Sequence, residues 1–170
     1  MSFERNTNNG VTINDYQERI SYDPNGNILR YIRHGDAARL SMDSLNYYYK
    51  TNAWGTNHLD KVVDSATDAS QQNYPLYNDI KQGQANGNYK YDAIGNLISD
   101  DSDHVTNITW NVYGKIKSVS RTGLQPVAYI YDASGNRIMK QTQNDTTVYV
   151  RDASGNVLSE YYKPANNSSS

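Results

Sequence analysis

A short motif that recurs along the chain constrains its fold more than any other feature of the sequence. Residues 131–136 read Tyr, Asp, Ala, Ser, Gly, Asn. Before the motif, Tyr129, Ile130 and Tyr131 alternate with the period of two that sends successive side chains to opposite faces of a sheet. Asp132 can accept hydrogen bonds from backbone N–H groups of a turn, and Gly135 can adopt the left-handed conformation that closes it. The segment therefore predicts a β-hairpin.

The recurrence of this motif predicts a repeat architecture. Complete copies contain Tyr22, Asp23, Gly26 and Asn27; Tyr91, Asp92, Gly95 and Asn96; and Tyr131, Asp132, Gly135 and Asn136. A degenerate copy has Trp110, Asn111 and Gly114, and the last copy, with Asp152, Gly155 and Asn156, has lost the aromatic residue. From Asp92 onward the copies are spaced by 19, 21 and 20 residues, which leaves room for one two-stranded hairpin per repeat.

The predicted fold is all-β and consists of consecutive antiparallel β-hairpins, in repeats of about 20 residues, that form a curved or spiralling sheet. We expect a flexible lead-in over residues 1–10, one repeat domain over 11–162 and a disordered tail over 163–170. A polar insertion over residues 64–84 is expected to form a long loop within that domain.

Composition favours thin sheets over a thick globular core. Only 36% of the residues are hydrophobic, the mean hydropathy is −0.85, and the apolar side chains are scattered singly between polar ones. The chain has 16 Tyr against one Phe and two Trp. Tyrosine can pack its ring while its hydroxyl stays in water, which suits partly exposed β-surfaces.

Charge and hydropathy patterning argue against several classes of partner. The net charge is −2 and no basic patch is present, so nucleic acid is not an expected partner. No stretch approaches the length of about 20 apolar residues that a membrane helix needs, so membrane insertion is not expected. Residues 1–6 carry no hydrophobic signal-peptide core, and the chain has no cysteine, which leaves the cellular compartment open.

The repeated segments resemble the YD repeats of bacterial RHS-repeat proteins, which also occur in insecticidal toxin complexes and in teneurins. Besides the turn motifs, the resemblance includes residues 31–35, 42–49, 87–97 and 149–157, and it extends from about Arg19 to Tyr162. It implies a spiralling sheet of hairpins, which in full-length relatives forms a hollow toxin shell, and it favours a secreted or cell-surface location. With about six hairpins and no RHS-associated core or toxin domain, the chain is expected to be a piece of shell wall.

No constellation of residues indicates an enzyme, a cofactor or a metal site. The repeated aspartates each belong to their own turn, so we interpret them as turn caps and not as an acid–base pair. The cluster Asp100, Asp101, Ser102 and Asp103 lacks the spacing of a calcium loop and is interpreted as a solvated turn. The histidines His34, His58 and His104 lack metal-ligand spacing.

Two functions are compatible with these observations. The first is a non-catalytic structural segment of a shell or scaffold, whose partners are flanking repeats of a longer chain or other copies of itself, paired through open strand edges into filaments or rings. The alternative is a cell-surface binding or adhesion module that stacks carbohydrate on aromatic residues, for which the candidates are Tyr47, Tyr49, Trp54 and Trp110.

Overall fold

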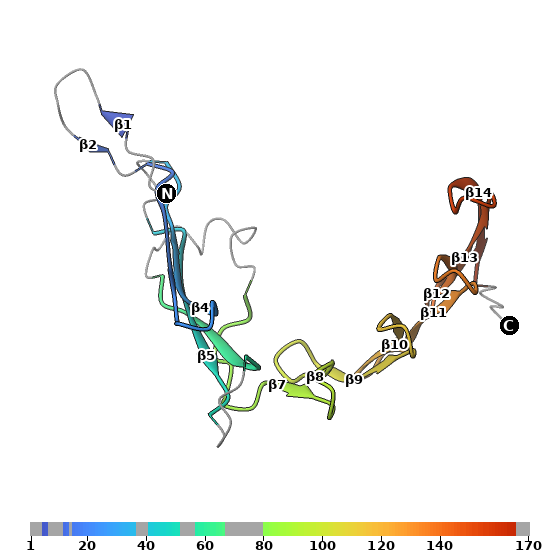
Figure 1. Cartoon of the computed structure of the whole chain (residues 1–170), viewed down its shortest axis with the longest axis horizontal. Coiled ribbons are helices and arrows are strands. Elements are labelled where there is room, and N and C mark those ends of the chain that lie inside the picture. Colours follow the sequence, from blue (N-terminus) through green and yellow to red (C-terminus); the bar gives the residue numbers. More distant parts are fainter. Residues whose placement is uncertain are drawn as a thin grey trace, which may run out of the picture. The chain divides into compact units, whose positions relative to one another are not determined.

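The computed structural model describes residues 5–6, 12–13, 15–36, 41–51, 57–66 and 80–165. These residues contain strands and turns but no helix, and consecutive antiparallel hairpins build the sheets (Figure 1), which confirms the predicted fold class. The chain divides into two compact units, Met1–Tyr89 and Lys90–Ser170.

The first unit contains a four-stranded antiparallel sheet with its strands in sequence order. Its strands are β3 (Glu18–Tyr22), β4 (Ile28–Arg33), β5 (Asp43–Tyr49) and β6 (Leu59–Asp64). A separate two-stranded pair consists of β1 (Arg5–Asn6) and β2 (Thr12–Ile13). Leu45 on β5 and Val62 on β6 are buried and form the apolar centre of the four-stranded sheet.

One buried charge accompanies this apolar centre. Asp43, the first residue of β5, is only 1% exposed, and its carboxylate accepts a hydrogen bond from Nε of Arg33 on β4. The two residues are paired directly across the sheet, because Arg33 lies opposite Asp43 in the β4–β5 register. The ion pair therefore joins these two strands at the end of the sheet farthest from the β3–β4 turn.

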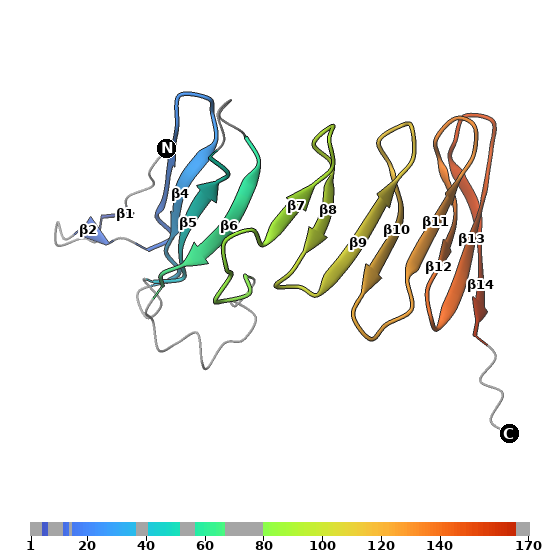
Figure 2. The same cartoon turned by 90° about the horizontal axis from the view of Figure 1, so that it is seen from below.

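The other sheet has eight strands, again in sequence order, from β7 at one edge to β14 at the other. The strands are β7 (Tyr89–Tyr91), β8 (Leu97–Asp100), β9 (Val105–Trp110), β10 (Ile116–Arg121), β11 (Val127–Tyr131), β12 (Arg137–Gln141), β13 (Asp145–Arg151) and β14 (Val157–Pro164). Figure 2 shows that the turns between β9 and β10, β11 and β12, and β13 and β14 lie at the same end of the strands of this sheet. Among its described residues only Val105 and Ile108 are buried apolar side chains, so the sheet is thin.

Some boundaries differ from the expected ones or fall outside the described residues. β14 continues to Pro164, because Lys163 and Pro164 still pair with Thr146 and Asp145 on β13, so two residues of the expected tail belong to a strand. Most of the expected lead-in and residues 67–79 of the expected loop lie outside the described residues, as does Trp54. The single repeat domain over residues 11–162 stays a prediction.

Candidate functional site

The repeated turns contain almost identical hydrogen-bond networks. In the turn that starts at Asp132, the amide of Gly135 donates to the Asp132 carbonyl at 3.0 Å, and the Asp132 amide donates to the Asn136 carbonyl at 2.9 Å. The Asp132 carboxylate accepts one bond from the Asn136 amide at 2.8 Å and another from the Asn136 side chain at 3.2 Å. Gly135 has a φ of 80°, which confirms the predicted left-handed conformation.

The same network recurs at the other complete turns, where a carboxylate oxygen accepts the amide of the asparagine four residues later. The N···O distances are 2.8 Å for Asn27 to Asp23, 2.9 Å for Asn96 to Asp92 and 2.9 Å for Asn156 to Asp152. In the degenerate copy, Asn111 Oδ1 accepts from the amides of Tyr113 and Lys115. An amide side chain therefore replaces the carboxylate without loss of the turn.

These bonds lower the pKa of the turn aspartates. For Asp23 and Asp152 the main cause is the hydrogen bond from the side chain of Asn27 or Asn156, and for Asp132 it is the bond from the Asn136 amide. At Asp92 burial opposes the shift, but the bonds from Asn96 outweigh it and the pKa is also lowered. The carboxylates therefore act as ionised acceptors, each inside its own turn.

We expect the stability of the protein to fall on acidification because of these turns. A carboxylate whose pKa is lower in the folded than in the unfolded state stabilises the fold above its unfolded pKa, here near 3.8. That contribution is lost as the pH falls through the folded value. Melting temperatures measured from pH 5 to pH 2 should therefore decline, and Asp132→Asn should melt lower at pH 7 but decline less. An identical decline in both proteins would contradict this role for Asp132.

Gly135→Val should lower the unfolding free energy by about 1–2 kcal/mol, because a β-branched residue is strained at positive φ. An added Cβ would lie 3.3 Å from Lys115 Nζ, the mobile end of a side chain that can shift, so the backbone conformation dominates the cost. Gly135→Asn is the matched control, since asparagine tolerates this conformation better. Urea unfolding compares the two variants, and equal losses would show that backbone strain is not the cause.

A second set of contacts joins neighbouring hairpins, and we call it the donor ladder. In each case the residue immediately before a turn donates a side-chain hydrogen bond to a backbone carbonyl of the preceding hairpin. The bonds run from Tyr49 Oη to Ile28 at 2.9 Å, Trp110 Nε1 to Leu97 at 2.8 Å, Tyr131 Oη to Ile116 at 2.8 Å and Arg151 Nε to Arg137 at 3.1 Å. Every acceptor is the fifth residue after the first residue of its own turn.

The donor ladder explains the substitutions in the repeat. Tyrosine, tryptophan and arginine share a long side chain with an O–H or N–H near its tip, so Trp110 and Arg151 make the same kind of bond as Tyr131. The interpretation of Arg151 as a lost aromatic therefore missed what the position does. The sequence shows a long donor side chain before each of these turns, but it does not show the acceptor in the preceding hairpin.

The donor ladder also identifies the turn equivalent between β5 and β6. The Lys50 amide donates to the His58 carbonyl at 2.9 Å, as Asp132 donates to Asn136, and Tyr49 precedes Lys50 as Tyr131 precedes Asp132. Burial raises the pKa of the Tyr49 hydroxyl, as expected for a group enclosed between hairpins. Lys50 therefore occupies the first position of a turn that the sequence motif did not reveal.

None of the three stacking candidates that the structure describes presents a fully exposed ring. Tyr49 and Trp110 are half-buried and engaged in the donor ladder, Tyr47 is half-buried on β5, and Trp54 lies outside the described residues. The aromatic ring exposed on β5 is instead Tyr48, which is 47% exposed, with Lys61 Nζ 5.1 Å from its ring centroid. A cavity of ≈ 580 Å³ adjoins this ring and is lined by Tyr48, Tyr49, Lys50, Thr51, Asp60, Lys61 and Asn86.

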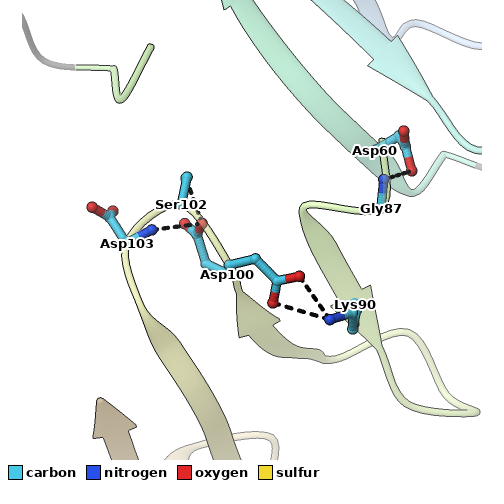
Figure 3. A network of polar contacts seen from close by, with 7 residues as sticks. Asp60, Gly87, Lys90, Asp100, Ser102 and Asp103 are labelled. Atoms are coloured by element: carbon cyan, nitrogen blue, oxygen red, sulfur yellow. Dashed lines mark hydrogen bonds and ion pairs between the residues drawn. The ribbon is translucent and has the colours of Figure 1, made fainter. Parts of the chain in front are cut away.

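The acidic cluster forms a turn whose side chains bond to one another and to a lysine (Figure 3). Asp100 Oδ1 accepts bonds from Ser102 Oγ at 2.8 Å and from the Asp103 amide at 3.3 Å. Lys90 Nζ on β7 lies 2.8 and 3.0 Å from the two carboxylate oxygens of Asp101. In the described part of the chain, no three His, Cys, Asp or Glu side chains are grouped so that they could hold a metal ion.

The comparisons with known proteins add no family assignment. No family model matches the chain, and no curated protein matches it. Within the described ranges, no helix has the length and hydropathy needed to cross a membrane. The proposal of a function therefore depends on the capped turns and on the side-chain hydrogen bonds of the donor ladder.

Proposed function

We propose that the chain is a non-catalytic structural repeat segment of an RHS/YD-type shell or extracellular scaffold. The observation that supports this proposal best is the donor ladder, in which four hairpins are each tied to the preceding one by a side-chain hydrogen bond at the same position. Arrays stabilised by such nearest-neighbour contacts are extended by adding units and need no thick core. The resemblance of the turn motifs to YD repeats is consistent with a secreted or cell-surface wall.

Contacts between consecutive turns support the same proposal. Lys115 Nζ donates to the carbonyl of Gly135 in the next turn, and Asn27 Nδ2 donates to Asn57 Oδ1 at 3.0 Å. The Asn136 side chain lies against Gly155, where an added Cβ would be 3.1 Å from Asn136 Nδ2. Polar side chains of the turns thus contact the neighbouring hairpins and stabilise their arrangement.

Removal of one whole repeat tests the scaffold proposal. Deletion of residues 132–151 joins Tyr131 directly to Asp152, which restores the sequence Tyr, Asp, Ala, Ser, Gly, Asn at the junction. We expect this variant to fold cooperatively with the β-sheet circular dichroism of the parent and with a lower melting temperature, because one interface is lost. The matched control deletes residues 132–141, which removes a turn and one strand and leaves Val127–Tyr131 without its return strand.

The two deletions should behave differently. The half-repeat variant is expected to lose cooperative unfolding or to aggregate, since its unpaired strand exposes backbone donors and acceptors. If the whole-repeat deletion were as damaging as the half-repeat deletion, the hairpins would not be exchangeable units. The scaffold proposal would then fail.

A second candidate function is carbohydrate binding, and the cavity beside Tyr48 is the observation that favours it. An exposed ring next to Asp60, Lys61 and Asn86 offers a stacking surface with polar groups, which is the usual combination in sugar sites. A glycan array with the full chain, repeated with Tyr48→Ala and with Tyr161→Ala as an exposed tyrosine remote from the cavity, tests it. Binding that Tyr48→Ala alone abolishes would support this function.

A further inference from the structure

The donor position of the β3–β4 hairpin makes no ladder bond to the described residues. Tyr22 occupies the position before the turn at Asp23, as Tyr131 does before Asp132, yet it is 56% exposed and its hydroxyl makes no hydrogen bond to the described residues. The four donors that reach a preceding hairpin, Tyr49, Trp110, Tyr131 and Arg151, are all half-buried. Tyr22 on β3 thus presents the ladder's donor on a strand that is outermost among the described strands of its sheet.

An outer strand of the eight-stranded sheet, β14, presents the ladder's acceptor. Val157 on β14 is the fifth residue after Asp152, the position whose carbonyl accepts the bond in the four observed cases. Val157 is 44% exposed, whereas Ile28, Leu97 and Ile116, three of the residues that accept such a bond, are half-buried. β14 is the outer strand of the eight-stranded sheet.

The strand registers predict which strand would fit against β14. Arg30 lies opposite Asn46, Ser118 opposite Ala128 and Met139 opposite Val148. In all three pairs, the first residue lies seven positions after the first residue of its own turn, and its partner lies four positions before the first residue of the next turn. For the β5–β6 turn, that first residue is Lys50. The pairing of Asp100 with Val105 between β8 and β9 is offset by one residue from this register.

We propose that β14 of one molecule pairs antiparallel with β3 of a second copy in this register, an inference that rests on the proposed scaffold function. The register places Ser159 opposite Arg19 and Leu158 opposite Ile20, and the Tyr22 hydroxyl of the second copy donates to the Val157 carbonyl. Leu158 is 66% exposed and Ile20 is 45% exposed. Pairing therefore covers apolar side chains of both edges as well as their backbone groups.

The same register places Glu160 opposite Glu18, and this pair limits the strength of the joint. Like charges directly opposite each other in an antiparallel pair are destabilising. Glu18 is held in place, because its carboxylate accepts a hydrogen bond from the Tyr31 hydroxyl at 3.0 Å and it lies opposite Arg33 on β4. Arg33 is itself paired with Asp43, so it compensates the negative charge of Glu18 only in part.

Charge reversal at this pair tests the register. Sedimentation velocity of the full 170-residue chain across a concentration series should show weak association of the parent protein. Glu160→Lys should associate about tenfold more tightly, since it replaces a repulsive pair by an attractive one, and the double variant Glu18→Lys/Glu160→Lys should return toward the parent. Tyr22→Phe should weaken association several-fold, while Tyr113→Phe, an exposed tyrosine in a turn, should not.

Disulfide trapping tests the same contact without relying on affinity. The chain has no cysteine, so a mixture of Ile20→Cys and Leu158→Cys proteins under oxidising conditions should form a mixed disulfide dimer. Ile20→Cys mixed with Ser159→Cys is the control, because the two thiols would then be one residue out of register and on opposite faces.

A parent protein and a Glu160→Lys variant that both stay monomeric, with equal trapping in the two mixtures, would overturn the joint. An association whose strength does not change in Glu160→Lys and Tyr22→Phe would overturn it as well, because the contact would then use another surface. Neither result touches the whole-repeat deletion, which tests the scaffold proposal by itself.

Discussion

Asp43→Ala is expected to lower the free energy of unfolding of the first unit by about 3 kcal/mol, at the lower end of the range for breaking a buried ion pair. Asp43 is 1% exposed and lies directly opposite Arg33, whose Nε donates to its carboxylate. The lower end applies because the Arg33 side chain is 33% exposed and retains access to water. The loss should appear in the strands that this pair joins, β4 and β5.

Amide hydrogen exchange followed by NMR measures this loss strand by strand. The protection of the β4 and β5 amides should fall, since their opening free energy includes the ion pair. Asp101→Ala is the matched control, because its pair with Lys90 is 57% and 54% exposed and should contribute less than about 1 kcal/mol. Equal effects of the two substitutions would contradict the assignment of Asp43 as a buried structural charge.

The turns could be predicted from the sequence because their chemistry is local. An aspartate, a glycine at positive φ and an asparagine lie within five residues, and the hydrogen bonds that close the turn run between these residues. The strands next to the turns could also be predicted locally, because successive side chains alternate along them with a period of two. The turn that starts at Lys50 carries no copy of the motif, since it contains neither the aspartate nor the closely spaced Gly-Asn pair.

The donor ladder and the Arg33–Asp43 pair could not be predicted because they depend on register. Tyr131 and Ile116 are 15 residues apart, and their contact exists only when consecutive hairpins are aligned in one way. The alignment of consecutive hairpins cannot be derived from composition. The sequence shows only the long donor side chain before each turn. Nothing near Asp43 in the sequence indicates that it is buried.

Trp110→Ala is expected to lower the free energy of unfolding of the second unit by about 3 kcal/mol, the lower end for removal of a large aromatic side chain. Trp110 is half-buried at the end of β9, so its removal deletes packing between hairpins as well as the bond from Nε1 to the Leu97 carbonyl. Urea unfolding followed by circular dichroism measures the change. A loss below about 1 kcal/mol would contradict a structural role for this residue.

Two further substitutions at Trp110 separate the ring from the donor. Trp110→Phe keeps a ring but has no N–H, so it should lose roughly the 1 kcal/mol of a net hydrogen bond in addition to some packing. Trp110→Arg discards the ring but carries the donor that Arg151 uses at the equivalent position, and it should therefore be more stable than Trp110→Ala. If Trp110→Arg were no better than Trp110→Ala, a donor would not be what the position requires. The presence of Arg151 before the last turn would then have to be explained by its packing, or by its second bond to the Gly155 carbonyl at 2.6 Å.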